Sequence, residues 1–261
     1  MSVSNPWVSV IIPFYNCPYV AQAIESILKQ TYPNVELIVV NDGSNEHQHL
    51  IIPYLTKIIY IEKINNGVAS AINQGIQQAK GEYLVWLSSD DIIDPYKVEY
   101  QLRFMQKKNS FFSFTNFNKI DKNSRIIKSN VIPHNVEVNY KNDLKFLQAL
   151  KNYNPINGCT VMMSRKIIDR VGYFNENLKY AQDYEYWIRV ALQFPIHYFP
   201  STLTSYRVHD AMGTIRHYKK QIEEFDSIKS QYKYTLDYLI QKKINASIKR
   251  TKRRRNNSSR K

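Results

Sequence analysis

Two adjacent aspartates, Asp90 and Asp91, follow an apolar run that ends at Leu87. Two carboxylates so close together repel each other unless a cation or a hydrogen-bond donor lies between them. Hard divalent ions such as Mg²⁺ and Mn²⁺ prefer carboxylate oxygens together with phosphate oxygens as ligands. The pair therefore predicts a site for a metal ion and a diphosphate. The alternative is that Asp91 caps the next segment while Asp90 is solvated, which is the commoner arrangement for an isolated pair.

The segments before these aspartates alternate between strand and helix patterns. β-Branched and apolar runs predict strands over residues 8–13, 36–40, 57–62 and 83–87. Apolar residues at helical spacing predict helices after the first and third strands, and Gly81 is expected to terminate the second helix. Such alternation predicts a parallel, doubly wound α/β sheet whose ligands bind at the carboxyl ends of the strands. Asp42, in a turn after the second strand, falls on the same edge as Asp90 and Asp91.

The rest of the chain has a less regular pattern. Residues 111–115, 159–163 and 203–208 look like strands, and residues 143–150 and 183–192 look like helices. From Tyr218 onward, apolar residues at helical spacing predict an amphipathic helix that leads into a basic tail.

Five motifs occur in the order and approximate spacing of family 2 glycosyltransferases with the GT-A fold. They are Val-Ser-Val-Ile-Ile-Pro-Phe-Tyr-Asn at 8–16, Glu-Leu-Ile-Val-Val-Asn-Asp-Gly-Ser at 36–44, Asn66-Gly67 with Asn73, Gly81-Glu82-Tyr83, and Ser89-Asp90-Asp91. The chain resembles this family closely over about residues 7–95 and more loosely through 172–174, 183–189 and 206–209. Each motif alone is weak evidence, whereas the ordered set is specific.

The resemblance implies a fold and an activity. The fold would be a Rossmann-like, mostly parallel GT-A domain over residues 1–217, with a nucleotide-sugar half at about 7–95 and an acceptor half at 96–217. Residues 218–261 would add the amphipathic helix and the polybasic tail. The activity would be inverting, Mn²⁺- or Mg²⁺-dependent transfer from a nucleotide-sugar donor, expected to be UDP-linked. The acceptor would be a hydroxyl of a glycan or lipid-linked molecule in surface polysaccharide or glycoconjugate synthesis.

The resemblance also implies roles for the donor-binding residues. Pro13, Tyr15 and Asp42 would line the base pocket, with Asp42 accepting a hydrogen bond from a uracil-like ring. Asp42 could equally be an Asx-turn residue if the resemblance is set aside. Asn66 and Gly67 would shape a loop near the diphosphate, although a plain turn explains them as well.

The metal site would involve two motifs that lie far apart in the sequence. By resemblance, Asp90 would contact the ribose or the donor sugar, and Asp91 would bind the metal ion. His209 would approach the metal or the diphosphate, since neutral imidazole is a suitable ligand for Mn²⁺. A lone histidine is more often an ordinary surface residue, and that alternative stays open for His209.

Asp183 lies in a second acidic motif, Tyr-Ala-Gln-Asp-Tyr-Glu-Tyr-Trp-Ile-Arg at 180–189. In the family that this motif resembles, the aspartate is the general base. Direct displacement at an anomeric carbon needs a base within reach of the acceptor hydroxyl, on the face opposite the leaving diphosphate. The structural alternative is that Asp183 caps a helix. In the same helix, Glu185 and Arg189 are expected to form an i, i+4 pair, and Trp187 is expected to pack in the core.

Three positions depart from the family pattern. Ile72 stands where many relatives have Arg, which removes a cationic contact to the nucleotide. Ser88 replaces a frequent Asp, and Gln182 replaces a common Glu. The departures put the donor identity and the metal affinity in doubt, but none of them deletes an essential carboxylate.

Charge is concentrated at the C-terminal end of the chain. The formal charge is +14, and residues 242–261 contain ten Lys or Arg and no acidic residue, which leaves +4 for the rest. Such a tail could bind an acidic membrane surface near a lipid-linked acceptor, or it could simply be solvated and disordered. The helix over 218–248 could form an oligomer contact. A nucleic-acid-binding protein is the competing function, but no reader motif is present. An inactive sugar-nucleotide-binding relative is a further alternative, although Asp90, Asp91 and Asp183 are retained.

The remaining features bear on location. The longest apolar runs have the length of strands, well short of the roughly 18–20 residues needed to cross a bilayer, and no secretory signal is readable at the N-terminus. A cytoplasmic protein is expected, peripheral to the inner face of the membrane if the tail binds there. Cys17 and Cys159 have no metal-type spacing and are expected to be free thiols.

Overall fold

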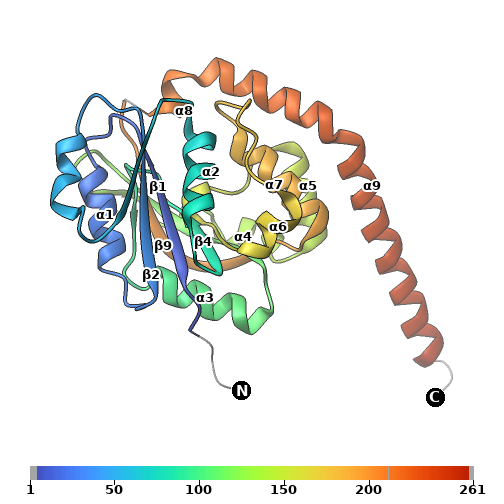
Figure 1. Ribbon diagram of the computed structural model, residues 1–261. Helices are drawn as coiled ribbons and strands as arrows, with labels where there is room; N and C mark the ends of the chain where they lie inside the picture. The colour runs from blue at the N-terminus through green and yellow to red at the C-terminus, as the bar shows by residue number, and fades with distance from the viewer. Residues whose placement is uncertain (1–4, 211, 259–261) are drawn as a thin grey trace.

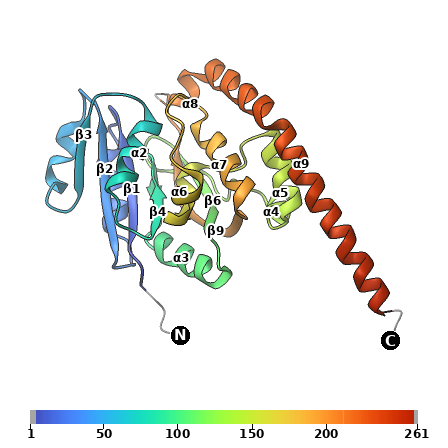
Figure 2. The ribbon, with the colours of Figure 1, turned by 45° about the vertical axis from the view of Figure 1, so that its right-hand side comes forward.

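A computed structural model describes residues 5–210 and 212–258 of the chain (Figures 1 and 2). The strands are β1 Val8–Phe14, β2 Val35–Asp42, β3 Ile59–Lys63, β4 Tyr83–Trp86, β5 Ile92–Ile93, β6 Phe112–Ile120, β7 Ile126–Lys128, β8 Met162–Ser164 and β9 His197–Arg207. The α-helices are α1 Val20–Leu28, α2 Val68–Gln78, α3 Lys97–Lys108, α4 His134–Tyr140, α5 Asp143–Asn152, α6 Arg165–Val171, α7 Gln182–Gln193, α8 Gly213–Arg216 and α9 Tyr218–Ser258. Short 3₁₀ helices are η1 Gln48–Leu50, η2 Ile52–Tyr54 and η3 Gly158–Thr160.

The strands form one sheet in the order β3-β2-β1-β4-β8-β6-β9-β5, with β7 paired to β6. The first four strands in this order pair in parallel with one another, as predicted. Because the chain moves outward from β1 to β3 and then returns to β4, the order reverses between β1 and β4. The carboxyl ends of strands on either side of such a reversal form a crevice in doubly wound folds.

Alternate residues of the central strands serve two cores, one on each face of the sheet. Val10 and Val39 pack with α1 and α3 on one face, whereas Ile11 and Ile38 pack with α2, α6 and α7 on the other. Figures 1 and 2 show these two helical layers around the twisted sheet. The continuous apolar runs in the sequence are therefore strands buried on both sides.

The second half of the sheet is mixed, and here the predicted elements differ from the observed ones. The predicted strands at 111–115 and 203–208 overlap β6 and β9, and these two strands are longer than predicted and pair in parallel. The predicted strand at 159–163 is divided into η3 and β8. Helices α3, α4 and α6 were not predicted.

Gly81 does not terminate α2. The helix ends at Gln78, and Ala79 is already extended with φ −63° and ψ 136°. A Cβ atom on Gly81 would lie 2.5 Å from the Ser9 hydroxyl and 2.6 Å from the Ser9 nitrogen. The glycine is thus required by its close approach to β1 and not by helix termination.

Helix α9 crosses the body of the protein and continues beyond it (Figure 1). Ile228 and Leu236 are buried in the same core as α5 and α7, and Leu239 and Ile240 pack against that core. The predicted boundary at residue 217 therefore does not divide the core. The helix was expected to offer an oligomer contact, but its apolar stripe packs against the chain's own body from Phe225 to Ile240. Within residues 5–210 and 212–258, no helix combines the length and hydrophobicity needed to cross a bilayer.

Candidate active site

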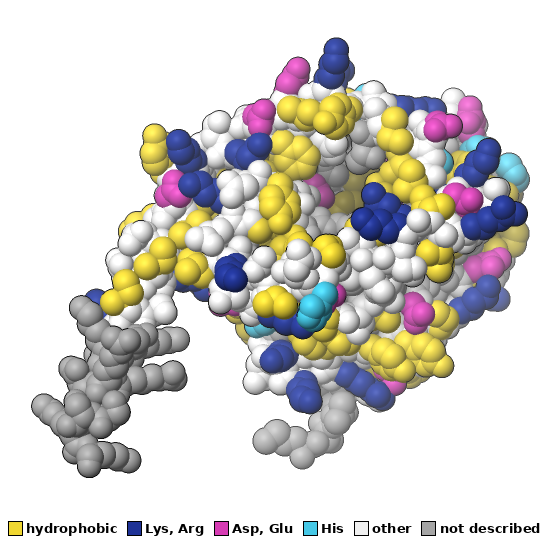
Figure 3. All heavy atoms as spheres, turned by 180° about the vertical axis from the view of Figure 1, so that it is seen from behind, with side chains coloured by type: hydrophobic (Ala, Val, Ile, Leu, Met, Phe, Trp, Pro, Cys, Tyr) yellow, Lys and Arg dark blue, Asp and Glu magenta, His cyan; other side chains and the backbone are white. Residues whose placement is uncertain are grey.

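A cleft of about 1040 Å³ lies at the carboxyl ends of β1, β2 and β4 and extends between α7 and the start of α9. Six of the predicted site residues line it, namely Pro13, Tyr15, Asp42, Asp90, Asp183 and His209. Asn66, Gly67 and Asp91 do not. The face seen in Figure 3 is hollowed in its upper half, with hydrophobic and basic side chains around the opening.

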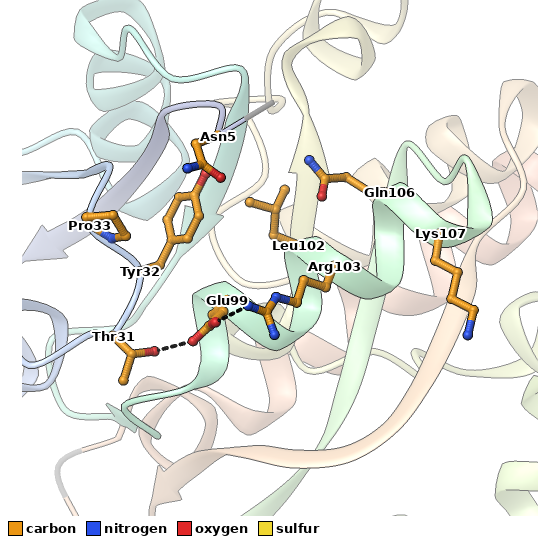
Figure 4. A pocket seen from close by; sticks show the side chains of 9 residues that line it. All are labelled: Asn5, Thr31, Tyr32, Pro33, Glu99, Leu102, Arg103, Gln106 and Lys107. Carbon is orange, nitrogen blue, oxygen red and sulfur yellow. Dashed lines mark hydrogen bonds and ion pairs between the residues drawn. The ribbon is translucent and has the colours of Figure 1, made fainter. Parts of the chain in front are cut away.

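A second hollow, of about 630 Å³, lies beside α3 and the loop after α1 (Figure 4). Its carboxylate, Glu99, is paired with Arg103 at 2.6 Å and accepts a hydrogen bond from the Thr31 hydroxyl at 2.7 Å. None of the residues predicted to do chemistry lines this hollow. The larger cleft is therefore the candidate active site.

Asp90 and His209 meet at the cleft although they are far apart in the sequence. The short strand β5, which begins directly after Asp91, pairs antiparallel with the end of β9 and brings the two segments together. The Nε2 atom of His209 lies 3.0 Å from Oδ2 of Asp90. The fully buried Arg207 holds this corner, since its Nε donates to the Asp90 carbonyl at 2.7 Å. The two cleft-facing groups are thus fixed by the sheet itself.

Asp91, which was predicted to bind the metal ion, is buried and does not line the cleft. Its side chain is 0 % exposed, and Oδ1 accepts a hydrogen bond from the Arg207 amide at 2.8 Å. Oδ2 has no hydrogen-bond partner within ordinary limits, although the nearby Cys159 thiol acts to lower the pKa of the carboxyl group. Burial and, secondly, the negative charge of Asp90 raise the pKa of Asp91 well above its usual value. Because its side chain is buried and does not line the cleft, Asp91 does not offer its oxygens to an ion in the cleft in this arrangement.

Asp42 organises the loop that contains Asn66 and Gly67. Its Oδ1 accepts from Lys63 Nζ at 2.6 Å and from the Asn66 amide at 3.0 Å, and its Oδ2 accepts from the Gly67 amide at 2.8 Å. Asn66 and Gly67 therefore shape a loop beside the cleft through their backbone. Because an ionised carboxylate offers about four acceptor positions, Oδ2 retains capacity for a further donor.

Asp183 is in the first turn of α7, and its mostly buried carboxylate faces the cleft. Oδ2 accepts from Asn154 Nδ2 at 2.9 Å, and Oδ1 accepts from the Tyr184 amide at 2.7 Å. The N-cap of the helix is Ala181, so Asp183 is not the cap. Burial raises the pKa of Asp183 to about 6, against the smaller opposing effect of these two hydrogen bonds. The group is therefore a stronger base than an ordinary aspartate.

This raised pKa predicts the pH dependence of turnover. A general base works only when deprotonated, so kcat is expected to fall about tenfold per pH unit below an apparent pKa near 6 and to level off above it. Steady-state rates from pH 4.5 to 8 at saturating donor would measure this limb. A limb below pH 4.5 would show that another group, or no ionisable group, limits the rate.

Two structural predictions for α7 are confirmed. Trp187 is buried in the core and stacks edge-on with Phe112. Arg189 donates from Nε to Glu185 at 2.7 Å, as an i, i+4 pair. Neither Trp187 nor Glu185 reaches the cleft, so the chemistry of this motif rests on Asp183.

Several residues that line the cleft belong to no motif of the sequence. Lys179 lines the cleft and donates from Nζ to the Asn66 carbonyl at 2.9 Å, which connects the segment before α7 to the loop of Asn66 and Gly67. Ile72, which stands where relatives have Arg, is buried in the core. A lysine in an irregular segment resembles any solvated lysine, so its position could not be read from the sequence.

Metal ligands are few at this site. In the described parts of the chain, no three His, Cys, Asp or Glu side chains gather in a way that could hold a metal ion. Asp90 and His209 supply one carboxylate and one imidazole, both facing the cleft. These donors fit Mn²⁺ if phosphate oxygens or waters complete its coordination.

Comparison with known sequences identifies relatives. The model of the family described as Glycosyl transferase family 2 matches residues 9–172. An uncharacterized glycosyltransferase of Rickettsia typhi is 36% identical over 232 residues, which cover 87% of this chain and 72% of the relative. WfaP of Escherichia coli, a UDP-Glc:alpha-D-GlcNAc-diphosphoundecaprenol beta-1,3-glucosyltransferase, is 33% identical over 85% of this chain and 86% of its own length. Other relatives are much longer, and the chain spans 36% of a Rickettsia felis glycosyltransferase.

Solved structures share the fold. TarS 1-349 of S. aureus in complex with UDP-GlcNAc superposes with a TM-score of 0.63 at 21% identity, over 79% of this chain and 60% of that one. The mannosyltransferase PcManGT from Pyrobaculum calidifontis in complex with GDP-Man and Mn2+ superposes with a TM-score of 0.62 at 17% identity, over 79% and 58% of the two chains.

Proposed function

Because this chain belongs to glycosyl transferase family 2 and is an enzyme of the glycosyltransferase class, we propose that it transfers a sugar from a UDP-sugar to an acceptor hydroxyl with inversion at the anomeric carbon. The observation that carries this proposal is that Asp42, Asp90, His209 and Asp183 line one cleft at the carboxyl edge of the sheet. The cleft thus combines groups for a nucleotide, a metal diphosphate and a proton acceptor.

The donor nucleotide would bind against β1 and β2. Pro13 and the half-exposed Tyr15 offer an apolar and aromatic wall, and Asp42 Oδ2 offers an acceptor for a ring N–H. The bound UDP-GlcNAc of TarS and the UDP-Glc in the name of WfaP support a uridine donor. Lys179 would add the positive charge that Ile72 does not supply.

The diphosphate would lie beside Asp90 and His209, and we assign the metal to these two residues and not to Asp91. Mn²⁺ in the PcManGT complex supports a divalent ion. When bound, such an ion neutralises the charge that develops on the departing diphosphate. Arg207 and Asp91 would act behind the site, since their hydrogen bonds fix the backbone from which Asp90 projects.

Asp183 would be the general base. It would take the proton of the acceptor hydroxyl while the hydroxyl oxygen forms the new bond to the anomeric carbon and the bond to UDP breaks. Asn154 and the Tyr184 amide orient the carboxylate for this step. A single displacement inverts the configuration, and the name of WfaP gives a β linkage formed from UDP-Glc, whose sugar is α-linked.

The acceptor would be a glycan or lipid-linked hydroxyl, as the diphosphoundecaprenol in the name of WfaP supports. The tail over 242–261 would hold the enzyme at the acidic inner face of the membrane, since each basic residue near such a surface contributes about 1 kcal/mol. Residues 259–261 and the side chains of 250–258 lie outside the described part of the chain.

A thermal-shift screen of nucleotide-sugars with and without Mn²⁺ tests this proposal. UDP-sugars are expected to raise the melting temperature, more in the presence of Mn²⁺, because a ligand that binds only the folded state stabilises it. GDP- and CMP-sugars serve as matched controls. No response to any nucleotide-sugar would contradict the proposal, and a response to nucleic acid alone would favour the competing function.

A further inference from the structure

One carboxylate of α9 binds three consecutive backbone amides next to the cleft. Glu224 accepts hydrogen bonds from the amides of Lys179, Tyr180 and Ala181 at 2.9, 2.8 and 2.9 Å. Hydrogen bonds to an ionised acceptor are roughly twice as strong as neutral ones. Glu224 therefore holds this backbone more firmly than an ordinary loop is held.

The held segment leads directly into the first turn of α7. The N-cap of α7, Ala181, makes no side-chain capping hydrogen bond. The three amides bound by Glu224 immediately precede the helical residues, and a negative charge at the start of a helix is favourable. Glu224 thus binds the amide of the N-cap residue from a distant helix, two residues before Asp183.

At its other end, the same segment is bonded to the loop that contains Asn66 and Gly67. Glu176 accepts from Asn73 Nδ2 at 2.8 Å and from Asn66 Nδ2 at 3.3 Å, and Lys179 donates to the Asn66 carbonyl. The segment from 176 to 183 therefore joins the loop beside the nucleotide position to the proposed base.

Further contacts place α9 around this segment. Gln221 lines the cleft and donates to the Tyr180 carbonyl at 3.2 Å. Phe225 also lines the cleft and packs on Tyr184, with ring centroids 5.0 Å apart. The first turns of α9 are thus part of the cleft wall.

We propose that Glu224 is a positioning residue for sugar transfer, which sets Lys179 and Asp183 in a fixed relation by clamping the backbone between them. This inference rests on the proposed function of Asp183. Small displacements of a reacting group are costly, and a shift of about 1 Å can lower a rate about 100-fold. Helix α9, although it lies outside the residues matched by the family model, then contributes to catalysis through the position of Asp183.

The test compares Glu224→Gln and Glu224→Ala with Glu223→Gln and Glu223→Ala. Glu223 is the adjacent, exposed residue of the same helix, so it controls for changes of charge and helix propensity. Hydrogen-deuterium exchange of residues 176–184, without substrate, should rise about tenfold in Glu224→Gln and stay unchanged in the Glu223 variants. Because this measurement needs no activity, it tests whether Glu224 restrains the backbone of residues 176–184 even if the proposed function is wrong.

Steady-state kinetics then test whether this restraint matters for sugar transfer. We expect kcat of Glu224→Gln to fall roughly 10- to 100-fold with little change in the affinity for UDP, and Glu224→Ala to fall further if it folds. A loosened segment should also hydrate Asp183, so the acid limb of kcat should move below pH 6. Normal exchange in Glu224→Gln, or faster exchange with kcat and pH profile unchanged, would overturn the proposal.

Discussion

Replacement of Asp183 by Asn is expected to lower the rate of sugar transfer roughly 100- to 10,000-fold, which is the usual contribution of a general base. Asn has the same shape and can still accept a hydrogen bond from the Tyr184 amide, but it cannot take up the acceptor proton. The affinity for UDP should change less than threefold, because Asp183 acts on the acceptor. A UDP-release assay and isothermal titration calorimetry measure the two quantities separately.

Asp169→Asn is the matched control for this prediction. Asp169 is an exposed carboxylate on α6 and does not line the cleft. Its replacement should leave both turnover and UDP affinity unchanged. Full turnover by a folded Asp183→Asn protein would remove Asp183 as the base.

Replacement of Asp90 by Asn should abolish the stimulation of transfer by Mn²⁺, with a loss of roughly 100-fold or more. The reason is that a metal ion at a leaving group contributes several kcal/mol, and each 1.36 kcal/mol corresponds to a factor of ten. His209→Ala should weaken the Mn²⁺ response in the same direction, since His209 Nε2 lies 3.0 Å from Asp90 Oδ2. The measurement is the Mn²⁺ titration of transfer rate at saturating UDP-sugar.

Asp91→Asn separates the two assignments of the metal site. If Asp91 supports the corner from behind, this variant should stay folded, because Asn Oδ1 can still accept from the Arg207 amide, and it should keep the midpoint of its Mn²⁺ response. A folded Asp91→Asn protein without Mn²⁺ response, beside a normal Asp90→Asn protein, would restore the assignment made from sequence.

The central part of the fold could be predicted because its signals are local. The apolar runs at 8–13 and 36–40 are parallel strands buried on both faces, and their order placed Asp42 and Asp90 on one edge. Which of Asp90 and Asp91 lines the cleft could not be predicted. Which of two adjacent side chains faces the cleft is set by the pairing of β5 with β9, more than 100 residues later.

Residues that act through long-range contacts were also beyond prediction. Asn154 reaches Asp183 across 29 positions, and Glu224 reaches the amide of Ala181 across 43. Neither belongs to a motif, and Glu224 looks like any charged residue of an amphipathic helix. The domain boundary predicted at residue 217 also overlooked a long-range contact. Only the tertiary structure reveals that Ile228 belongs to the main core.

The most direct test of the account is the configuration of the product, determined by ¹H NMR of the anomeric proton after transfer from an α-linked UDP-sugar to lipid-linked GlcNAc or water. A single displacement assisted by Asp183 predicts a β-configured product, recorded before mutarotation when water is the acceptor. An α-configured product would contradict the proposed mechanism.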